Sequence, residues 1–129
     1  MRTAERGRVP RILVVEDDVV VRRTYNRFAS KLGYKAEDVA SVGEAAAALR
    51  RERFDLIILD AHLSDAYGSA VIMAIREAVA GSMPPMVVIS SDDSADLREA
   101  MLAAGADEFL AKPVSFARLS EVLAKWLSR

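Results

Sequence analysis

The stretch FDLIILDAHLSDAYG, residues Phe54 to Gly68, contains four consecutive large apolar residues that end on a single carboxylate, Asp60. Two further apolar runs, ILVV at 12–15 and MVVI at 86–89, are equally short. Runs of this length with no polar face are typical of strands that are buried on both sides in a parallel sheet. The sequence therefore predicts three central strands, one of which presents a carboxylate at its end.

The segments around these runs complete an alternating pattern. Apolar residues recur at helical spacing after the first and third runs, Ser41 is suited to cap an alanine-rich helix, and 68–80 and 116–126 show the same periodicity. Two more polar strands are expected at 35–40 and 106–111. Five strands alternating with five helices predict an α/β fold of the flavodoxin-like, doubly wound type, with a parallel sheet of strand order 2-1-3-4-5.

Length and composition narrow the class of protein. The chain has 129 residues, 52% hydrophobic and 29% charged, which fits one domain with a core and a charged surface. A formal net charge of −1 gives no sign of a direct nucleic-acid or membrane partner, and without cysteine there are no disulfides, thiolate metal sites or cysteine nucleophiles. No run is apolar enough for a signal peptide or a membrane span. We expect a mobile N-terminal arm at 1–10, one domain at 11–129 and a cytoplasmic location.

Polar side chains stand where the predicted strands end. Glu16 and Asp17 follow the first strand and Asp60 ends the third, and the expected strand order makes these two strands neighbours. Three carboxylates at one sheet edge repel one another unless a cation lies between them, and such oxygen ligands suit Mg²⁺. Ser90 and Lys112 end the fourth and fifth strands, where they could face a bound anion. The sequence therefore predicts a divalent metal site with a lysine and a hydroxyl beside it.

This constellation resembles the receiver domains of two-component response regulators, over about Arg11 to Trp126. The matching positions, in chain order, are Glu16 and Asp17, the acceptor aspartate Asp60, Gly68, Ser90, AGA at 104–106 and Lys112-Pro113. Each motif is weak alone, whereas their order and spacing together are specific. The bond before Pro113 is also one at which a cis peptide costs little.

The resemblance implies a phosphoacceptor signalling domain rather than an enzyme. A phosphoryl group would pass from a phosphohistidine of a sensor kinase or a histidine phosphotransfer protein to Asp60, and Lys112 would pair with the phosphoryl oxygens. The metal ion, Mg²⁺ or Mn²⁺, would have four protein ligands: Glu16, Asp17, Asp60 and the backbone carbonyl of His62. Such a transfer needs mainly positioning and charge neutralisation.

The resemblance also implies a switch. Ser90 would turn toward the phosphoryl oxygen and Phe109 would change rotamer, so that the surface of the fourth helix, fifth strand and fifth helix engages a downstream protein or a second copy of the chain. His62 and Asp92 occupy positions that tune the phosphoryl lifetime in the family, and we hypothesise that they set it here by pairing across the entrance. Ser64 replaces a proline usual in the family, which predicts a looser loop after the acceptor.

Other functions stay open at this point. A phosphatase with an aspartate nucleophile would carry a second aspartate two residues later, where this chain has His62, so that class is disfavoured. A non-phosphorylated interaction module on the same fold is the main alternative, although the retained charges oppose it. The residues fit both a stand-alone regulator and a receiver segment of a longer protein. Simpler structural roles are a helix cap for Ser90 and a core position for Phe109.

Overall fold

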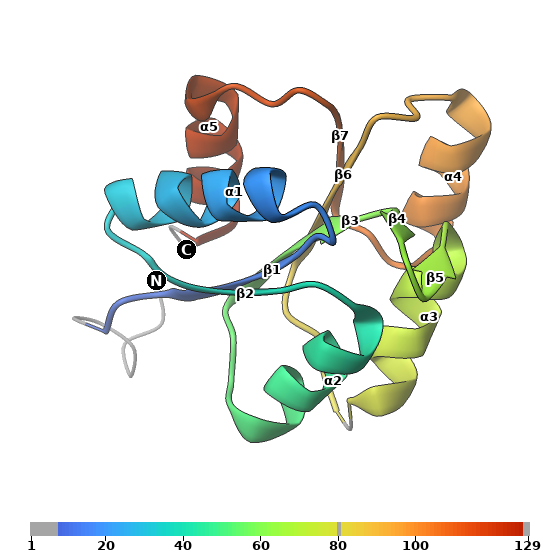
Figure 1. Cartoon of the computed structure of the whole chain (residues 1–129), viewed down its shortest axis with the longest axis horizontal. Helices are drawn as coiled ribbons and strands as arrows, with labels where there is room; N and C mark the ends of the chain where they lie inside the picture. The colour runs from blue at the N-terminus through green and yellow to red at the C-terminus, as the bar shows by residue number, and fades with distance from the viewer. Residues whose placement is uncertain (1–7, 80, 128–129) are drawn as a thin grey trace.

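The computed structural model describes residues 8–79 and 81–127, and its central layer is a parallel sheet (Figure 1). Five strands form this sheet: β1 (Arg11–Val15), β2 (Lys35–Val39), β3 (Leu56–Asp60), β6 (Met86–Ser90) and β7 (Glu108–Ala111). Their order is β2-β1-β3-β6-β7, and each neighbouring pair is parallel. The predicted flavodoxin-like order is confirmed, with β6 and β7 as the expected fourth and fifth strands.

Helices cover both faces of the sheet. The five helices are α1 (Val19–Lys31), α2 (Val42–Arg51), α3 (Ser69–Ala78), α4 (Ala95–Ala104) and α5 (Phe116–Leu127). Figure 1 shows α1 and α5 on one face, whereas α2, α3 and α4 lie on the other. Two cores result: Tyr25 and Leu119 pack with alternate strand residues on the first face, and Ile72 and Met101 with the remaining ones on the second. All five residues of β3 and of β6 are buried, as their apolar runs predict.

Short polar side chains begin the helices that leave the carboxyl edge of the sheet. Asp18 accepts hydrogen bonds from the backbone N–H groups of Val20 and Val21, at 2.9 and 3.1 Å, and so caps α1 directly after the acidic pair. Ser41 caps α2, as predicted, and Ser94 caps α4. These caps fix where each helix begins, and therefore where the side chains between the end of the strand and the start of the helix lie.

A short antiparallel hairpin between β3 and α3 was not predicted from the sequence. Its strands are β4 (His62–Leu63) and β5 (Ala66–Tyr67), with His62 opposite Tyr67. Gly68 closes the hairpin by donating its N–H to the carbonyl of Ala61 at 2.7 Å, with a φ of 65° that favours glycine. Ser64, for which a looser loop was expected, lies with Asp65 in the turn between these two paired strands.

The predicted N-terminal arm, residues 1–10, is described by the structure only from Arg8 onward. Residues 1–7 of the predicted arm lie outside the described residues. Arg8, in contrast, pairs with Asp55 at 3.0 Å, and the carbonyl of Pro10 accepts the N–H of Lys35 at 3.0 Å. Contacts with the domain therefore begin before Arg11. Over 8–79 and 81–127, no helix has the length and apolar character needed to cross a membrane.

Candidate functional site

Three carboxylates converge at the carboxyl edge of the sheet. β1 and β3 are paired in a register that sets Val15 beside Leu59, so the residues that follow them emerge next to each other. One carboxylate oxygen from each of Glu16, Asp17 and Asp60 lies within 4.8 Å of the others. Glu16 and Asp60 are buried, at 2% and 7% exposure, whereas Asp17 is open to solvent. The predicted acidic cluster is present, and its hard oxygen donors fit a divalent cation such as Mg²⁺.

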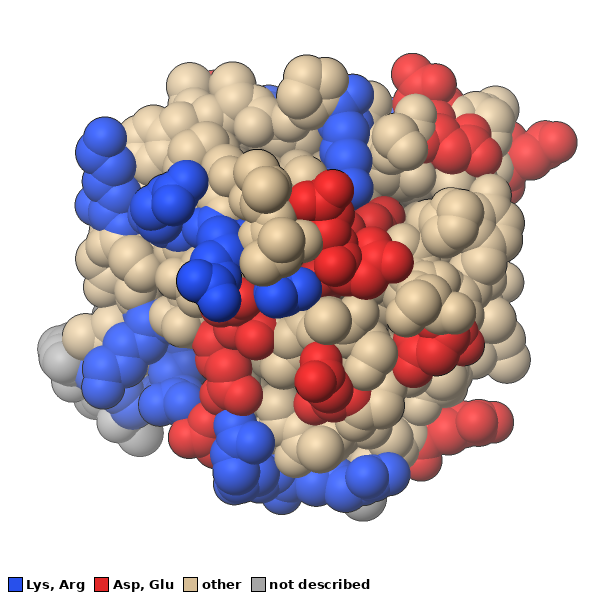
Figure 2. All heavy atoms as spheres, in the orientation of Figure 1, with Lys and Arg blue, Asp and Glu red and all other residues tan. Residues whose placement is uncertain are grey.

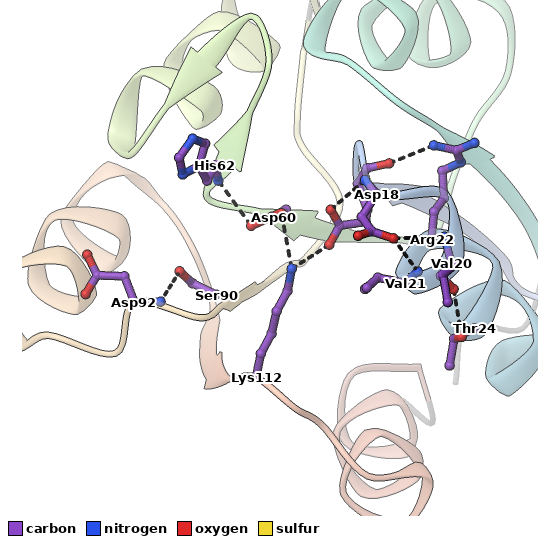
Figure 3. Close-up of polar contacts among 11 residues, drawn as sticks. Asp18, Val20, Val21, Arg22, Thr24, Asp60, His62, Ser90, Asp92 and Lys112 are labelled. Carbon is purple, nitrogen blue, oxygen red and sulfur yellow. Dashed lines mark hydrogen bonds and ion pairs between the residues drawn. The ribbon is translucent and has the colours of Figure 1, made fainter.

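Lys112 completes this cluster from the end of β7 (Figure 3). Its ammonium lies 2.6 Å from Oε1 of Glu16 and 3.3 Å from Oδ2 of Asp60. The backbone holds it there, because the N–H of Lys112 donates to the carbonyl of Ser90 at 2.8 Å. The Lys112–Pro113 peptide bond is cis. The lysine thus bridges two of the three carboxylates.

The titration of these groups follows from their burial and mutual contacts. Burial raises the pKa of Glu16, the neighbouring Asp60 raises it further, and the hydrogen bonds from Lys112 and the N–H of Asp18 only partly oppose this. Burial also acts to lower the pKa of Lys112, but the hydrogen bond to Glu16 and the charges of Asp60 and Glu16 outweigh it, so that this pKa is raised. The site therefore keeps a charged ammonium and holds a buried acid that loses its proton less readily than usual.

The two oxygens of Asp60 have different partners. Oδ1 accepts the backbone N–H of His62 at 3.1 Å, and Oδ2 faces Lys112. Ser90, which is 2% exposed, lies on the neighbouring strand and accepts the N–H of Asp92 on its Oγ at 3.1 Å. These contacts fix the carboxylate plane at the sheet edge and place a hydroxyl on the strand beside it.

Two segments lie beside Asp60: the hairpin of β4 and β5, and the loop between β6 and α4. Figure 3 shows His62, from β4 of the hairpin, and Asp92, from the loop after β6, on the same side of Asp60. Asp92 was hypothesised to pair with His62. Instead it accepts hydrogen bonds from the hydroxyl of Tyr67 at 3.3 Å and from the N–H of Ser94 at 3.0 Å. The bond from the N–H of Ser94, with that from Tyr67, lowers the pKa of Asp92. The His62 ring instead contacts the Tyr67 ring edge to face, with centroids 5.1 Å apart.

Phe109, the expected switch residue, is a core side chain in this structure. It is 4% exposed and belongs to the core under α2, α3 and α4. Arg98 of α4 covers it, with the guanidinium carbon 4.9 Å from the ring centroid and Nη1 3.4 Å from the carbonyl oxygen of Phe109. The residue thus couples α4 to β7 by packing.

Arg22 supports the site and was not predicted from the sequence. Arg22 donates to the carbonyl of Glu16 at 3.1 Å and to Asp38 at 2.8 Å, so it joins the acidic loop to β2. Arg22 lies one turn into the helix that follows the acidic pair, and this position in the sequence could have indicated its contact with the acidic loop. Figure 2 shows the resulting surface, with acidic side chains near the start of α1 and basic ones along this helix.

Comparison with known proteins gives the same picture. The family model of the response regulator receiver domain matches residues 12–124. The sensory/regulatory protein RpfC of Xanthomonas campestris pv. campestris is 33% identical over 96% of this chain and 17% of its own length. Response regulator MprA of Mycolicibacterium vanbaalenii is 36% identical over 89% of this chain and 48% of its own length. The chain thus spans less than half the length of these curated relatives.

Solved structures with the same fold include two receiver domains. The receiver domain of the sensor histidine kinase PA1611 from Pseudomonas aeruginosa, with a magnesium ion coordinated in its active-site cleft, has a TM-score of 0.82 and 30% identity, over 94% of this chain and 99% of that one. A CheY-like receiver domain protein from Methanospirillum hungatei has a TM-score of 0.84 and 28% identity, over 93% and 94% of the two chains.

Proposed function

The chain belongs to the response regulator receiver domain family of two-component signalling, and from this premise we propose that it is a phosphoacceptor whose acceptor is Asp60. One observation carries the proposal. Asp60 ends a fully buried strand, and its carboxylate lies within reach of two further carboxylates and of the ammonium of Lys112. The strand acts as a rigid mount that presents one nucleophilic oxygen at the sheet edge.

The proposed reaction is a single phosphoryl transfer. An oxygen of Asp60 forms a bond to phosphorus while the bond from phosphorus to the donor's histidine nitrogen breaks, and the electron pair of that bond stays on the imidazole. Lys112, already 3.3 Å from Asp60, pairs with the charge of the phosphoryl oxygens. Bound Mg²⁺ or Mn²⁺ would neutralise further phosphoryl charge, with Glu16, Asp17, Asp60 and the carbonyl of His62 as its ligands.

The proposal includes the output of the domain. Ser90 turns toward the phosphoryl group, which requires that its Oγ release the N–H of Asp92. Phe109 and Arg98 then transmit the change to the surface of α4, β7 and α5, where a downstream protein or a second copy of the chain binds. His62 and Asp92 influence the lifetime of the phosphoryl group. The donor is a histidine kinase or a histidine phosphotransfer protein in the cytoplasm.

The test is the intact mass after incubation with acetyl phosphate, with and without Mg²⁺. We expect the wild type to gain one phosphoryl group only when Mg²⁺ is present and Asp60→Asn to gain none. Asp96→Asn, an exposed acid on α4, is the matched control and should behave as the wild type does. A gain by Asp60→Asn equal to that of the wild type would refute the assignment of the acceptor.

A wild type that gains no phosphoryl group is then tested with a phosphorylated histidine phosphotransfer protein. Transfer from that protein would support the proposal for protein donors alone. Failure with both donors would favour the alternative, a non-phosphorylated interaction module on the same fold.

A further inference from the structure

Contacts form a closed ring around the entrance to Asp60. The N–H of His62 donates to Asp60, the ring of His62 contacts Tyr67, and the hydroxyl of Tyr67 donates to Asp92. The N–H of Asp92 donates to Ser90, whose strand β6 is paired with β3 beside Asp60. Only the Tyr67 hydroxyl connects the hairpin of β4 and β5 to the loop between β6 and α4 within this ring.

Each end of this connection is well placed by its own loop. Tyr67 lies opposite His62 in the hairpin, which fixes the direction of its ring. Asp92 is held by the N–H of Ser94 on Oδ1, so Oδ2 points to the hydroxyl of Tyr67. Asp60 is 7% exposed whereas Tyr67 is 53% exposed, so the connection is made at the surface of the protein, next to a buried acceptor. The two segments that Tyr67 joins both reach the acceptor strand or its neighbour, because His62 donates to Asp60 and Asp92 donates to Ser90.

We propose that Tyr67 is a positioning residue that holds the entrance to Asp60 closed, and that it thereby slows both loading by small phosphodonors and loss of the phosphoryl group to water. This inference rests on the proposed function. In the hydrolysis, a water oxygen bonds to phosphorus as the bond from phosphorus to the Asp60 oxygen breaks. Asp60 leaves as a carboxylate with the electron pair, and the water proton passes to solvent. Water must approach phosphorus roughly in line with the breaking bond, from the entrance side.

The test compares decay of the phosphorylated wild type with that of Tyr67→Phe, Asp92→Ala and the double variant. Tyr67→Phe keeps the ring against His62 and removes only the hydroxyl. We expect each single variant to lose its phosphoryl group about fivefold faster, the change that corresponds to one ordinary hydrogen bond. The double variant should be no faster than the faster single variant, because both changes break the same connection.

Loading separates closure of the entrance from a merely structural effect. Tyr67→Phe should gain the phosphoryl group from acetyl phosphate faster than the wild type, with Mg²⁺ affinity unchanged and an unfolding midpoint lowered by no more than the roughly 4 °C that loss of one hydrogen bond costs. Tyr34→Phe is the matched control, since Tyr34 lies before β2 at the opposite edge of the sheet, and it should match the wild type in loading and decay.

The outcomes distinguish this inference from the function on which it rests. If the wild type and Tyr67→Phe are both phosphorylated and decay at the same rate, Tyr67 has no such role and the proposed function stands. If decay effects of Tyr67→Phe and Asp92→Ala multiply in the double variant, the two residues act separately and the inference is overturned. If neither protein is phosphorylated by any donor, the proposed function itself fails, and the inference fails with it.

Discussion

At the scale of single residues, Lys112 has two opposing effects on the site. Its ammonium contacts Glu16 at 2.6 Å and Asp60 at 3.3 Å, and so it neutralises the carboxylates that a metal ion would use. The same ammonium is the group best placed to pair with an oxygen of a phosphoryl group bound to Asp60. Metal affinity and transfer rate should therefore respond in opposite directions to its removal.

Lys112→Met tests this opposition, because methionine keeps much of the length of the side chain and removes its charge. We expect Mg²⁺ to bind about tenfold more tightly, since one competing cation is gone. Phosphorylation by acetyl phosphate should slow by about 100-fold, as is usual when one preorganised charge-stabilising donor is lost. Calorimetric titration and the rate of mass gain measure the two quantities.

Lys35→Met is the control for this prediction, because Lys35 is an exposed lysine that begins β2 at the far edge of the sheet. It should change neither quantity. Weaker Mg²⁺ binding by Lys112→Met would show that the lysine orders the carboxylates more than it competes with the metal.

At the scale of elements, the hairpin of β4 and β5 is held by a side chain in its turn. Asp65 accepts hydrogen bonds from the N–H groups of Val42 and Gly43, at 3.1 and 3.3 Å. It therefore caps α2, although it lies more than 20 residues later in the sequence. An acidic side chain at a helix N-terminus is favoured both by these hydrogen bonds and by the helix dipole. This contact anchors the loop after the acceptor, which contains Ser64, to the start of α2.

Asp65→Ala should therefore destabilise the domain by about 1 kcal/mol, the usual cost of losing a helix cap, which lowers the unfolding midpoint by roughly 4 °C at this chain length. Thermal unfolding measures this change. Hydrogen exchange should also become faster at the N–H groups of Val42, Gly43 and Gly68. Ser41→Ala removes the other cap of α2 and should cost a similar amount without the change at Gly68. Equal exchange at Gly68 in both variants would contradict the proposed connection.

The elements differ in how well the sequence predicts them. The central strands were predicted because residues buried on both faces must all be apolar, and this leaves a signal in the sequence. The site was predicted because strand order alone brings the ends of β1, β3, β6 and β7 to one edge. The hairpin was missed, since strands of two residues have no periodicity. The Tyr67–Asp92 contact was missed because it joins residues 25 positions apart, in loops whose course depends on side-chain packing.

At the scale of the whole molecule, folding brings Asp60 to the adjacent carboxylates Glu16 and Asp17, from which it is far apart in the unfolded chain. Apolar packing on both faces of the sheet provides the free energy that holds them together, and Lys112 offsets part of their repulsion. The folded state should bind Mg²⁺ and the unfolded chain should not, because only the folded chain assembles the cluster. Metal binding is therefore linked to global stability.

The pH dependence of stability should reveal this linkage. The pKa of Glu16 is raised in the folded metal-free protein above its usual value of 4.5, chiefly by burial. Its contribution to stability is therefore present below the unfolded pKa and is lost as the pH rises through the folded pKa. The carboxylate that the metal needs appears over the same range. We expect the Mg²⁺-dependent gain in stability to grow as the pH rises from the usual glutamate pKa of 4.5 through the raised pKa of Glu16 in the folded protein. Above that pKa, Mg²⁺ at about 100 times its Kd should add about 2.7 kcal/mol, or roughly 10 °C in the midpoint.

Thermal unfolding of the wild type and Glu16→Gln, each with and without Mg²⁺ across this pH range, measures the effect. Glu16→Gln should lose most of the gain and its dependence on pH. Glu121→Gln changes an exposed acid on α5, whose side chain is 72% exposed, and should keep both. A gain from Mg²⁺ that is equal in all three proteins would mean that the ion stabilises the domain somewhere other than the cluster of Glu16, Asp17 and Asp60.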